Sequence, residues 1–195
     1  MNSARLRQYG IPGLILLAVL APLVLAAIVY LQPRWFAFGH TNHGRLVRPP
    51  VTIKGTELPR VYAKGALPAD YFHGRWTLVY VGGPDCDADC RAALYATRQA
   101  RLAAGEDMRR VQRLYVVRGH AKPSRRLRRA HPHLTVVEAT GPAGEAFARQ
   151  FTHVRAAGGI YIVDPNSLLM MTYPPGADPS GLLKDLRHLL NANPA

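Results

Sequence analysis

The sequence predicts an α/β sandwich preceded by a single long apolar helix. Three observations carry this prediction. Strand-like and helix-like segments alternate along residues 75–190, the chain's 2 cysteines stand close together at one strand-to-helix junction, and residues 11–31 carry no charged side chain. A chain of 195 residues with 48% hydrophobic content can bury one substantial core, so a single globular domain is expected.

Residues 11–31 read IPGLILLAVLAPLVLAAIVYL. At 1.5 Å per residue this stretch covers about 30 Å, the thickness of a bilayer core. It is longer than the apolar region of about 7–15 residues in a cleavable signal peptide, so we expect a retained transmembrane anchor. Arg5 and Arg7 favour an N-terminus in the cytoplasm, although arginines beyond the apolar stretch weaken that preference.

The expected organisation is a cytoplasmic tail at residues 1–10, the anchor at 11–31, a linker leading into the domain at 32–60, and the folded domain at 61–195. Pro49 and Pro50 mark a non-helical passage in the linker. The predicted location is the bacterial inner membrane, with the C-terminal domain in the periplasm. Dithiols can cycle between oxidised and reduced states in that compartment.

The elements of the domain follow from residue type and spacing. RWTLVYVGG, at residues 75–83, is typical of a buried strand that ends in a turn, and the strong helix formers after Asp85 predict a helix that ends near Gly105. After this helix we expect a strand at 111–117, a short basic helix or loop at 124–130, a strand at 134–140 and a helix at 141–151. A hairpin of strands at 159–164 and 167–173 and a final helix at 179–190 should follow. Right-handed crossovers would place the helices on the sheet, and the hairpin would complete an edge.

Cys86 and Cys90 form a Cys-x-x-x-Cys pair at the predicted start of the first helix. With this spacing both sulfurs can occupy one helix face, roughly 6 Å apart along the axis. The partial positive charge of a helix N-terminus favours thiolate, which serves either disulfide exchange or metal binding. Asp85, Asp87 and Asp89 oppose this effect, or else they cap the helix and suit its dipole.

The net charge of +13 includes the basic run KPSRRLRRAHPH at residues 122–133. A field of this sign attracts any polyanion. The run lacks interleaved aromatic residues and any nucleic-acid motif, so nucleic acid is not an expected partner. Lipid headgroups, an acidic protein partner and a merely solvated face remain as alternatives.

The chain resembles the Sco/SenC family of membrane-anchored, thioredoxin-like copper proteins that assist cytochrome c oxidase assembly. The resemblance rests on the single anchor, on LVYVGGPDCDADC at 78–90, and on GGIYIVDPNSLLMMTY at 158–173. It covers roughly residues 40–190 and identifies a divergent member. It implies a thioredoxin-like, Sco/peroxiredoxin-like sandwich, copper as the cofactor, and a cytochrome c oxidase subunit or another acidic membrane protein as the partner.

The resemblance also implies site residues. Cys86 and Cys90 would be the redox-active pair and two copper ligands, since soft thiolates select Cu(I) and a histidine is usually added to hold Cu(II). Residues 156–158 occupy the loop positions where the family carries its copper-binding histidine, so His153 is the nearest candidate for a third ligand. No proline precedes Ile160, where redox thioredoxins carry a cis-proline.

Three functions stay open at this point. The first is an accessory factor for cytochrome oxidase assembly that delivers copper or keeps copper-site thiols reduced. The second is a membrane-tethered thiol–disulfide oxidoreductase that acts on secreted proteins or apocytochromes. The third is a binding scaffold with an inert disulfide and a basic docking face.

Overall fold

The computed structural model describes residues 16–24, 27–28, 31, 42–120, 124–154 and 158–192. The chain divides into two compact units, Met1–Thr41 and Asn42–Ala195. Residues 16–24 of the first unit are helical. Across the described residues, no helix combines the length and apolar character needed to cross a membrane. Residues 11–15, 25–26 and 29–30 of the predicted anchor at 11–31 lie outside the described residues.

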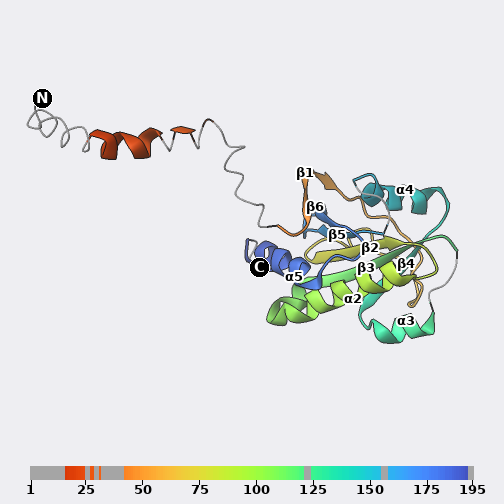
Figure 1. The fold of residues 1–195 in the computed structure, drawn as a ribbon. Helices are drawn as coiled ribbons and strands as arrows, with labels where there is room; N and C mark the ends of the chain where they lie inside the picture. Colours follow the sequence, from red (N-terminus) through yellow and green to blue (C-terminus); the bar gives the residue numbers. More distant parts are fainter. Residues whose placement is uncertain are drawn as a thin grey trace, which may run out of the picture. The chain divides into compact units, whose positions relative to one another are not determined.

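The second unit is built on a mixed sheet of six strands in the order β1-β6-β5-β2-β3-β4 (Figure 1). β2, β3 and the edge strand β4 run parallel. On the other side of β2, β5 is antiparallel to β2, β6 is antiparallel to β5, and β1 is antiparallel to β6. The strand bounds are β1 Arg45–Thr52, β2 Trp76–Gly82, β3 Val111–Arg118, β4 Leu134–Ala139, β5 Ile160–Val163 and β6 Leu168–Tyr173.

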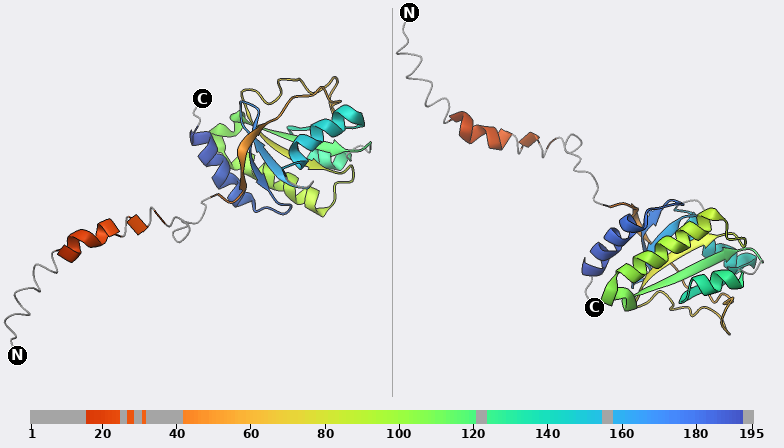
Figure 2. Two further views of the ribbon diagram at one scale, coloured as in Figure 1. Left: turned by 90° about the horizontal axis from the view of Figure 1, so that it is seen from above. Right: turned by 60° about the horizontal axis from the view of Figure 1, so that its bottom comes forward.

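Helices cover both faces of the sheet, as the two views of Figure 2 show. The bounds are α2 Ala88–Ala103, η1 (a 3-10 helix) Gly105–Arg110, α3 Arg125–Ala130, α4 Gly141–Thr152 and α5 Pro179–Ala192. α2, α3 and α5 pack on one face and α4 packs on the other. Side chains alternate along a strand, so the fully buried β2 contributes Leu78 and Tyr80 to the first core and Val79 and Val81 to the second.

The helices and strands expected from residue 75 onward are all present, with bounds that differ by a few residues. The main difference is β1, which lies inside the segment assigned to the linker at 32–60. The compact unit therefore begins at Asn42, before residue 61. β1 tolerates Pro49 and Pro50 because it is an edge strand whose pairing with β6 is interrupted between Leu46 and Val51. The β5–β6 hairpin is consequently not the edge, since β1 covers it.

Asp185 of α5 fixes the start of β1. Its buried carboxylate accepts hydrogen bonds from the backbone N–H groups of His43 and Gly44, at 2.8 Å each, and from the Tyr173 hydroxyl at 2.8 Å. Burial, followed by the bond to Asp185, raises the pKa of Tyr173, so its hydroxyl keeps the proton that it donates. This cluster joins residues from the two ends of the folded unit's sequence.

Candidate functional site

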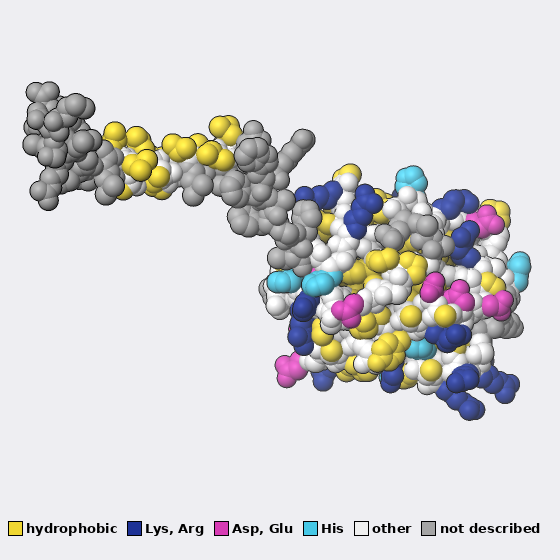
Figure 3. Space-filling model, in the orientation of Figure 1, with side chains coloured by type: hydrophobic (Ala, Val, Ile, Leu, Met, Phe, Trp, Pro, Cys, Tyr) yellow, Lys and Arg dark blue, Asp and Glu magenta, His cyan; other side chains and the backbone are white. Residues whose placement is uncertain are grey.

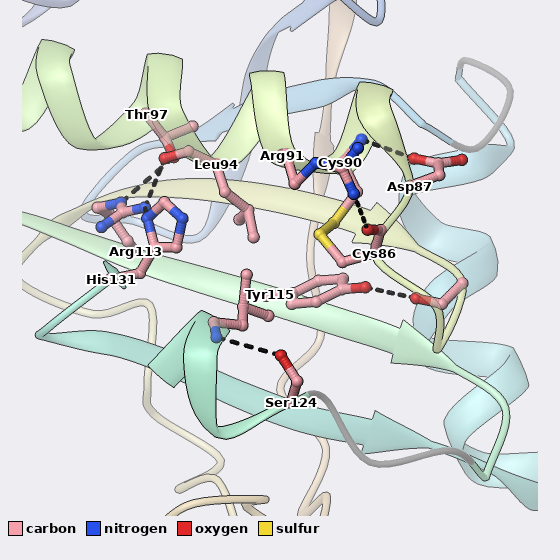
Figure 4. Close-up of a disulfide and its surroundings, with 12 residues drawn as sticks. Cys86, Asp87, Cys90, Arg91, Leu94, Thr97, Arg113, Tyr115, Ser124 and His131 are labelled. Carbon is pink, nitrogen blue, oxygen red and sulfur yellow. Dashed lines mark hydrogen bonds between the residues drawn. A yellow bond between two sulfur atoms is a disulfide. The ribbon is translucent and has the colours of Figure 1, made fainter. Parts of the chain in front are cut away.

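The two cysteines stand where β2 passes into α2 (Figure 4). Cys86 lies in the loop after β2, Cys90 lies in the first turn of α2, and a disulfide joins them with 5.1 Å between their Cα atoms. This separation is within the usual range for a disulfide. The predicted position at a strand-to-helix junction is confirmed, with Cys86 preceding the helix.

The two sulfurs differ in accessibility. Cys90 is only 2% exposed and belongs to the core between α2 and the sheet, whereas Cys86 is half-buried and packs against the rim of that core. Exchange requires a direct approach of an attacking thiolate to a sulfur atom. An incoming partner therefore reaches Cys86 first, and Cys90 can act only from inside.

The charged residues around the disulfide have defined roles. Asp87 is the N-cap of α2, and its Oδ1 accepts a hydrogen bond from the Cys90 N–H at 2.8 Å, which confirms the capping interpretation. Asp89 follows in the first turn. Arg91 Nη1 donates to the Cys86 carbonyl oxygen at 3.1 Å, so a guanidinium lies beside the more accessible cysteine. The disulfide therefore has both negatively and positively charged side chains around it.

Two tyrosines form the floor of the cysteine loop. The rings of Tyr80 and Tyr115 lie 5.4 Å apart, and the Tyr115 hydroxyl donates to the carbonyl oxygen of Gly83. Burial, and then the nearby Asp87 and Asp89, raise the pKa of Tyr80 to about 12, so it stays neutral at physiological pH. A side chain at Gly82 would collide with the Tyr80 ring. The tyrosines thus fix the loop from below.

A buried arginine stands under α2. Arg113 is 2% exposed and donates from Nη2 to the Leu94 carbonyl oxygen at 2.8 Å and from Nε to Thr97 Oγ1 at 3.2 Å (Figure 4). Its Nη2 also lies 3.4 Å from His131 Nδ1, which must accept because arginine only donates. Burial, then the neighbouring Arg101, lower the pKa of Arg113 to about 9, which leaves it charged at neutral pH.

Sequence reasoning did not select Arg113, the tyrosine pair or Arg91. A signal for Arg113 was present, because it is the one charged side chain inside the apolar run VQRLYVV and shares a strand face with Tyr115. His131 was likewise not selected; it is half-buried, and burial followed by Arg113 lowers its pKa to about 4. His131 is therefore neutral at physiological pH.

The structure does not bring His153 into a cluster with the cysteines. His153 is an exposed residue at the C-terminal end of α4, on the opposite sheet face from α2. In the described part of the chain, no three His, Cys, Asp or Glu side chains are grouped to hold a metal ion. The donor set described beside α2 is thus two sulfurs, and ligation by His153 stays a prediction.

Comparisons with known proteins place the fold. Three solved structures superimpose with low sequence identity, which shows a shared fold. The solution structure of apo Sco1 from Thermus thermophilus has a TM-score of 0.61 at 19% identity and covers 79% of this chain and 100% of that one. Yeast Sco1 with copper bound has a TM-score of 0.59 at 16% identity, covering 76% of this chain and 98% of that one. Arabidopsis thaliana ScoI with copper bound has a TM-score of 0.58 at 17% identity, covering 72% of this chain and 99% of that one.

The predicted thioredoxin-like sandwich and the resemblance to Sco/SenC proteins are therefore confirmed at the level of the fold. No curated protein sequence matches the chain. A family model described as "Transmembrane-like, thioredoxin-like, C-terminal domain" matches residues 76–193, which is more than half of the chain. The chain belongs to this transmembrane-like, thioredoxin-like family.

Proposed function

We propose that this protein is a Sco-like thiol–disulfide exchange factor that sets the redox state of a partner's copper-site thiols. One observation carries the proposal: the disulfide joins a half-buried cysteine at the surface to a cysteine that is 2% exposed in the core. An accessible sulfur paired with a protected one directs exchange to the accessible sulfur, because access governs which sulfur a partner reaches. The proposed setting is the periplasmic side of the inner membrane, with a cytochrome c oxidase subunit as the target.

The reaction balances as a transfer of two electrons. In the reduced protein, the Cys86 thiolate attacks the partner's disulfide, which forms a mixed disulfide and releases one partner thiolate that takes up a proton. The Cys90 thiol then loses its proton and attacks Cys86, which releases the second partner thiol and forms the Cys86–Cys90 disulfide. A separate dithiol protein is needed to reduce the pair again. Arg91, held beside Cys86, stabilises the attacking thiolate electrostatically.

The order of attack can be tested with single-cysteine variants of the full-length protein. Reduced Cys90→Ser should accumulate a mixed disulfide with oxidised glutathione through Cys86, and mass spectrometry should detect the added mass. Cys86→Ser is the matched control and should react far more slowly, because Cys90 is buried. Equal rates for the two variants would contradict the assignment of Cys86 as the attacking sulfur.

The midpoint potential decides between a working and an inert disulfide. A working pair should titrate within the range of exchange catalysts, about −270 to −120 mV. A midpoint below roughly −300 mV would instead indicate a structural bond and favour the scaffold function.

Copper handling is the second candidate function. It is supported by the yeast and Arabidopsis structures of the same fold with copper bound, and by the two sulfurs, which once reduced are a soft donor pair suited to Cu(I). The donors described beside α2 fit two-sulfur coordination but offer no third ligand. Competition titrations with a Cu(I) chelator should show lost binding for Cys86→Ser and Cys90→Ser. Weaker binding by His153→Ala would support the predicted third ligand, and unchanged binding would remove it.

A further inference from the structure

A groove of about 980 Å³ runs between α2 and α3, on the sheet face that carries the disulfide. Pro84 and Cys86 line one part of it, and His131 and Ala130 line another. Leu127, the buried residue of α3, holds that helix against the core, while Ser124 caps it by accepting the Leu127 N–H at 3.2 Å. One part of this groove therefore lies next to the sulfur that a partner reaches first.

The walls of the groove carry an excess of positive charge. Arg91 and Arg98 line it from α2, and Arg126 lines it from α3. Behind the wall, the charged Arg113 contacts the neutral His131. The acids that line the groove, Asp85 and Asp87, are both in the cysteine loop. The groove thus carries charges of both signs beside the disulfide, where Arg91 accompanies Asp85 and Asp87, and it is basic along the rest of its length.

The groove also offers an apolar contact. Tyr95 of α2 lines it and is 54% exposed. Ala92 and Ala130 add small apolar surfaces to the lining. Figure 3 shows Lys and Arg side chains gathered at the end of this face where α3 lies, next to apolar side chains over α2. An exposed aromatic flanked by arginines is the composition of a protein-binding hot spot.

We propose that the groove binds an extended acidic segment of a partner protein, with an apolar side chain of that segment packed on Tyr95. The charge gradient sets the direction of binding: acidic residues of the segment pair with Arg98 and Arg126, and a neutral stretch lies at Asp85 and Asp87. This orientation places the partner's reactive sulfur at Cys86. The last step rests on the proposed exchange function, whereas binding of the segment does not.

Fluorescence anisotropy with the full-length protein tests the binding. The probe is a labelled, cysteine-free peptide with a neutral N-terminal half, one Phe and four Glu residues, and the control peptide carries Gln in place of Glu. The acidic peptide should bind about tenfold more tightly than the control peptide, and the preference should shrink at high salt. Equal affinity for the two peptides would overturn the proposal.

Variants locate the binding. Arg98→Glu and Arg126→Glu should each weaken binding of the acidic peptide about fivefold or more, since a charge reversal replaces attraction by repulsion. Arg109→Glu, an exposed residue of η1 outside the groove lining, is the matched control and should bind as wild type does. Tyr95→Ala should weaken both peptides equally. An equal loss for Arg109→Glu would indicate a general charge effect and overturn the groove assignment.

Two further outcomes have definite meanings. If anionic phosphatidylserine vesicles bind in an Arg98- and Arg126-dependent manner while the acidic peptide does not, the surface docks lipid and the proposal fails.

If Cys86→Ser retains peptide binding but wild type shows no exchange with oxidised glutathione, the exchange function fails and the proposed peptide binding by the groove is retained. Arg98→Lys, which keeps the charge, should restore binding and so separates charge loss from misfolding.

Discussion

The two faces of the sheet are built on different principles. The α4 face is packed with aromatic rings, since Phe72, Phe147 and Phe151 are all 0% exposed with ring centroids 5.5 to 6.4 Å apart. The α2 face takes its side chains from the same strands, yet it buries Arg113 and Tyr115 on the side that carries the disulfide (Figure 4). Both faces bury an apolar core that supplies stability, and the α2 face in addition holds buried polar groups, which cost stability unless they are hydrogen-bonded.

The largest expected effect comes from the aromatic face. Phe147→Ala should lower the free energy of unfolding by about 3–5 kcal/mol, because it opens a cavity among rings that cannot collapse into it. Urea denaturation measures this loss. Phe147→Leu, which keeps most of the volume, is the matched control and should cost less than about 1.5 kcal/mol. A shift in the midpoint potential of the cysteine pair would contradict the separation of the two faces.

A smaller effect is expected at the N-cap of α2. Asp87→Ala should cost about 0.5–2 kcal/mol of stability through loss of the bond to the Cys90 N–H. It should also speed alkylation of reduced Cys86 by iodoacetamide, because one negative charge near the sulfur is removed. Asp89→Ala is the matched control, since it removes a charge of the same sign and has no capping bond. Equal destabilisation by both variants would show that the cap bond contributes little.

Sequence reasoning succeeded where local patterns decide the structure. The aromatic and β-branched run into Gly82 and Gly83 predicted β2, and the helix formers after Asp85 predicted α2, so the position of the dithiol followed from neighbouring residues. The acids around the cysteines are compatible with either opposing the thiolate or capping the helix, and the bond from the Cys90 N–H shows that Asp87 is the cap. These features depend on side chains within a few positions of one another.

The features that sequence reasoning missed depend on long-range packing. β1 pairs with β6 more than a hundred residues away, and its two prolines suggested a linker because an edge position cannot be recognised locally. The Arg113 cluster brings together α2, β3 and the residue after α3. The groove likewise exists only once α3 docks beside α2. No local periodicity encodes these distances.

The pH dependence of stability tests the polar face with a still smaller effect. Burial, then Arg113 from β3 and Arg98 from α2, hold the pKa of His131 at about 4, whereas the unfolded chain titrates near its usual value of 6.5. The unfolded state therefore binds more protons as the pH falls from about 6.5 to 4, and folded stability decreases across that window. Because His131 is half-buried and screened by solvent, its share should be at most about 1 kcal/mol.

The variant His131→Gln separates the contribution of His131 to the pH dependence of stability from the contribution of the carboxylates. Urea midpoints measured from pH 7 to pH 4.5 should fall less steeply for His131→Gln than for wild type. His133→Gln, two residues away and exposed, should follow the wild-type curve. Parallel curves for His131→Gln and wild type would show that its proton affinity is the same in both states.

The smallest expected effect on the unfolding free energy is at Arg113, the buried cation of the α2 face. Its described hydrogen-bond partners are neutral, and Thr97 Oγ1 already bonds to the Leu94 carbonyl oxygen, so removal of the guanidinium strands no charge. Burying a cation costs desolvation energy that an apolar side chain of similar length avoids. Arg113→Met should therefore change the unfolding free energy by less than about 1 kcal/mol, in either direction.

The same variant should raise the pKa of His131 toward its usual value, because one of the two cations that neighbour His131 is removed. NMR titration of His131 measures this shift. A loss as large as that of Phe147→Ala would mean that Arg113 holds the α2 face together, and the two faces would then not divide stability from function.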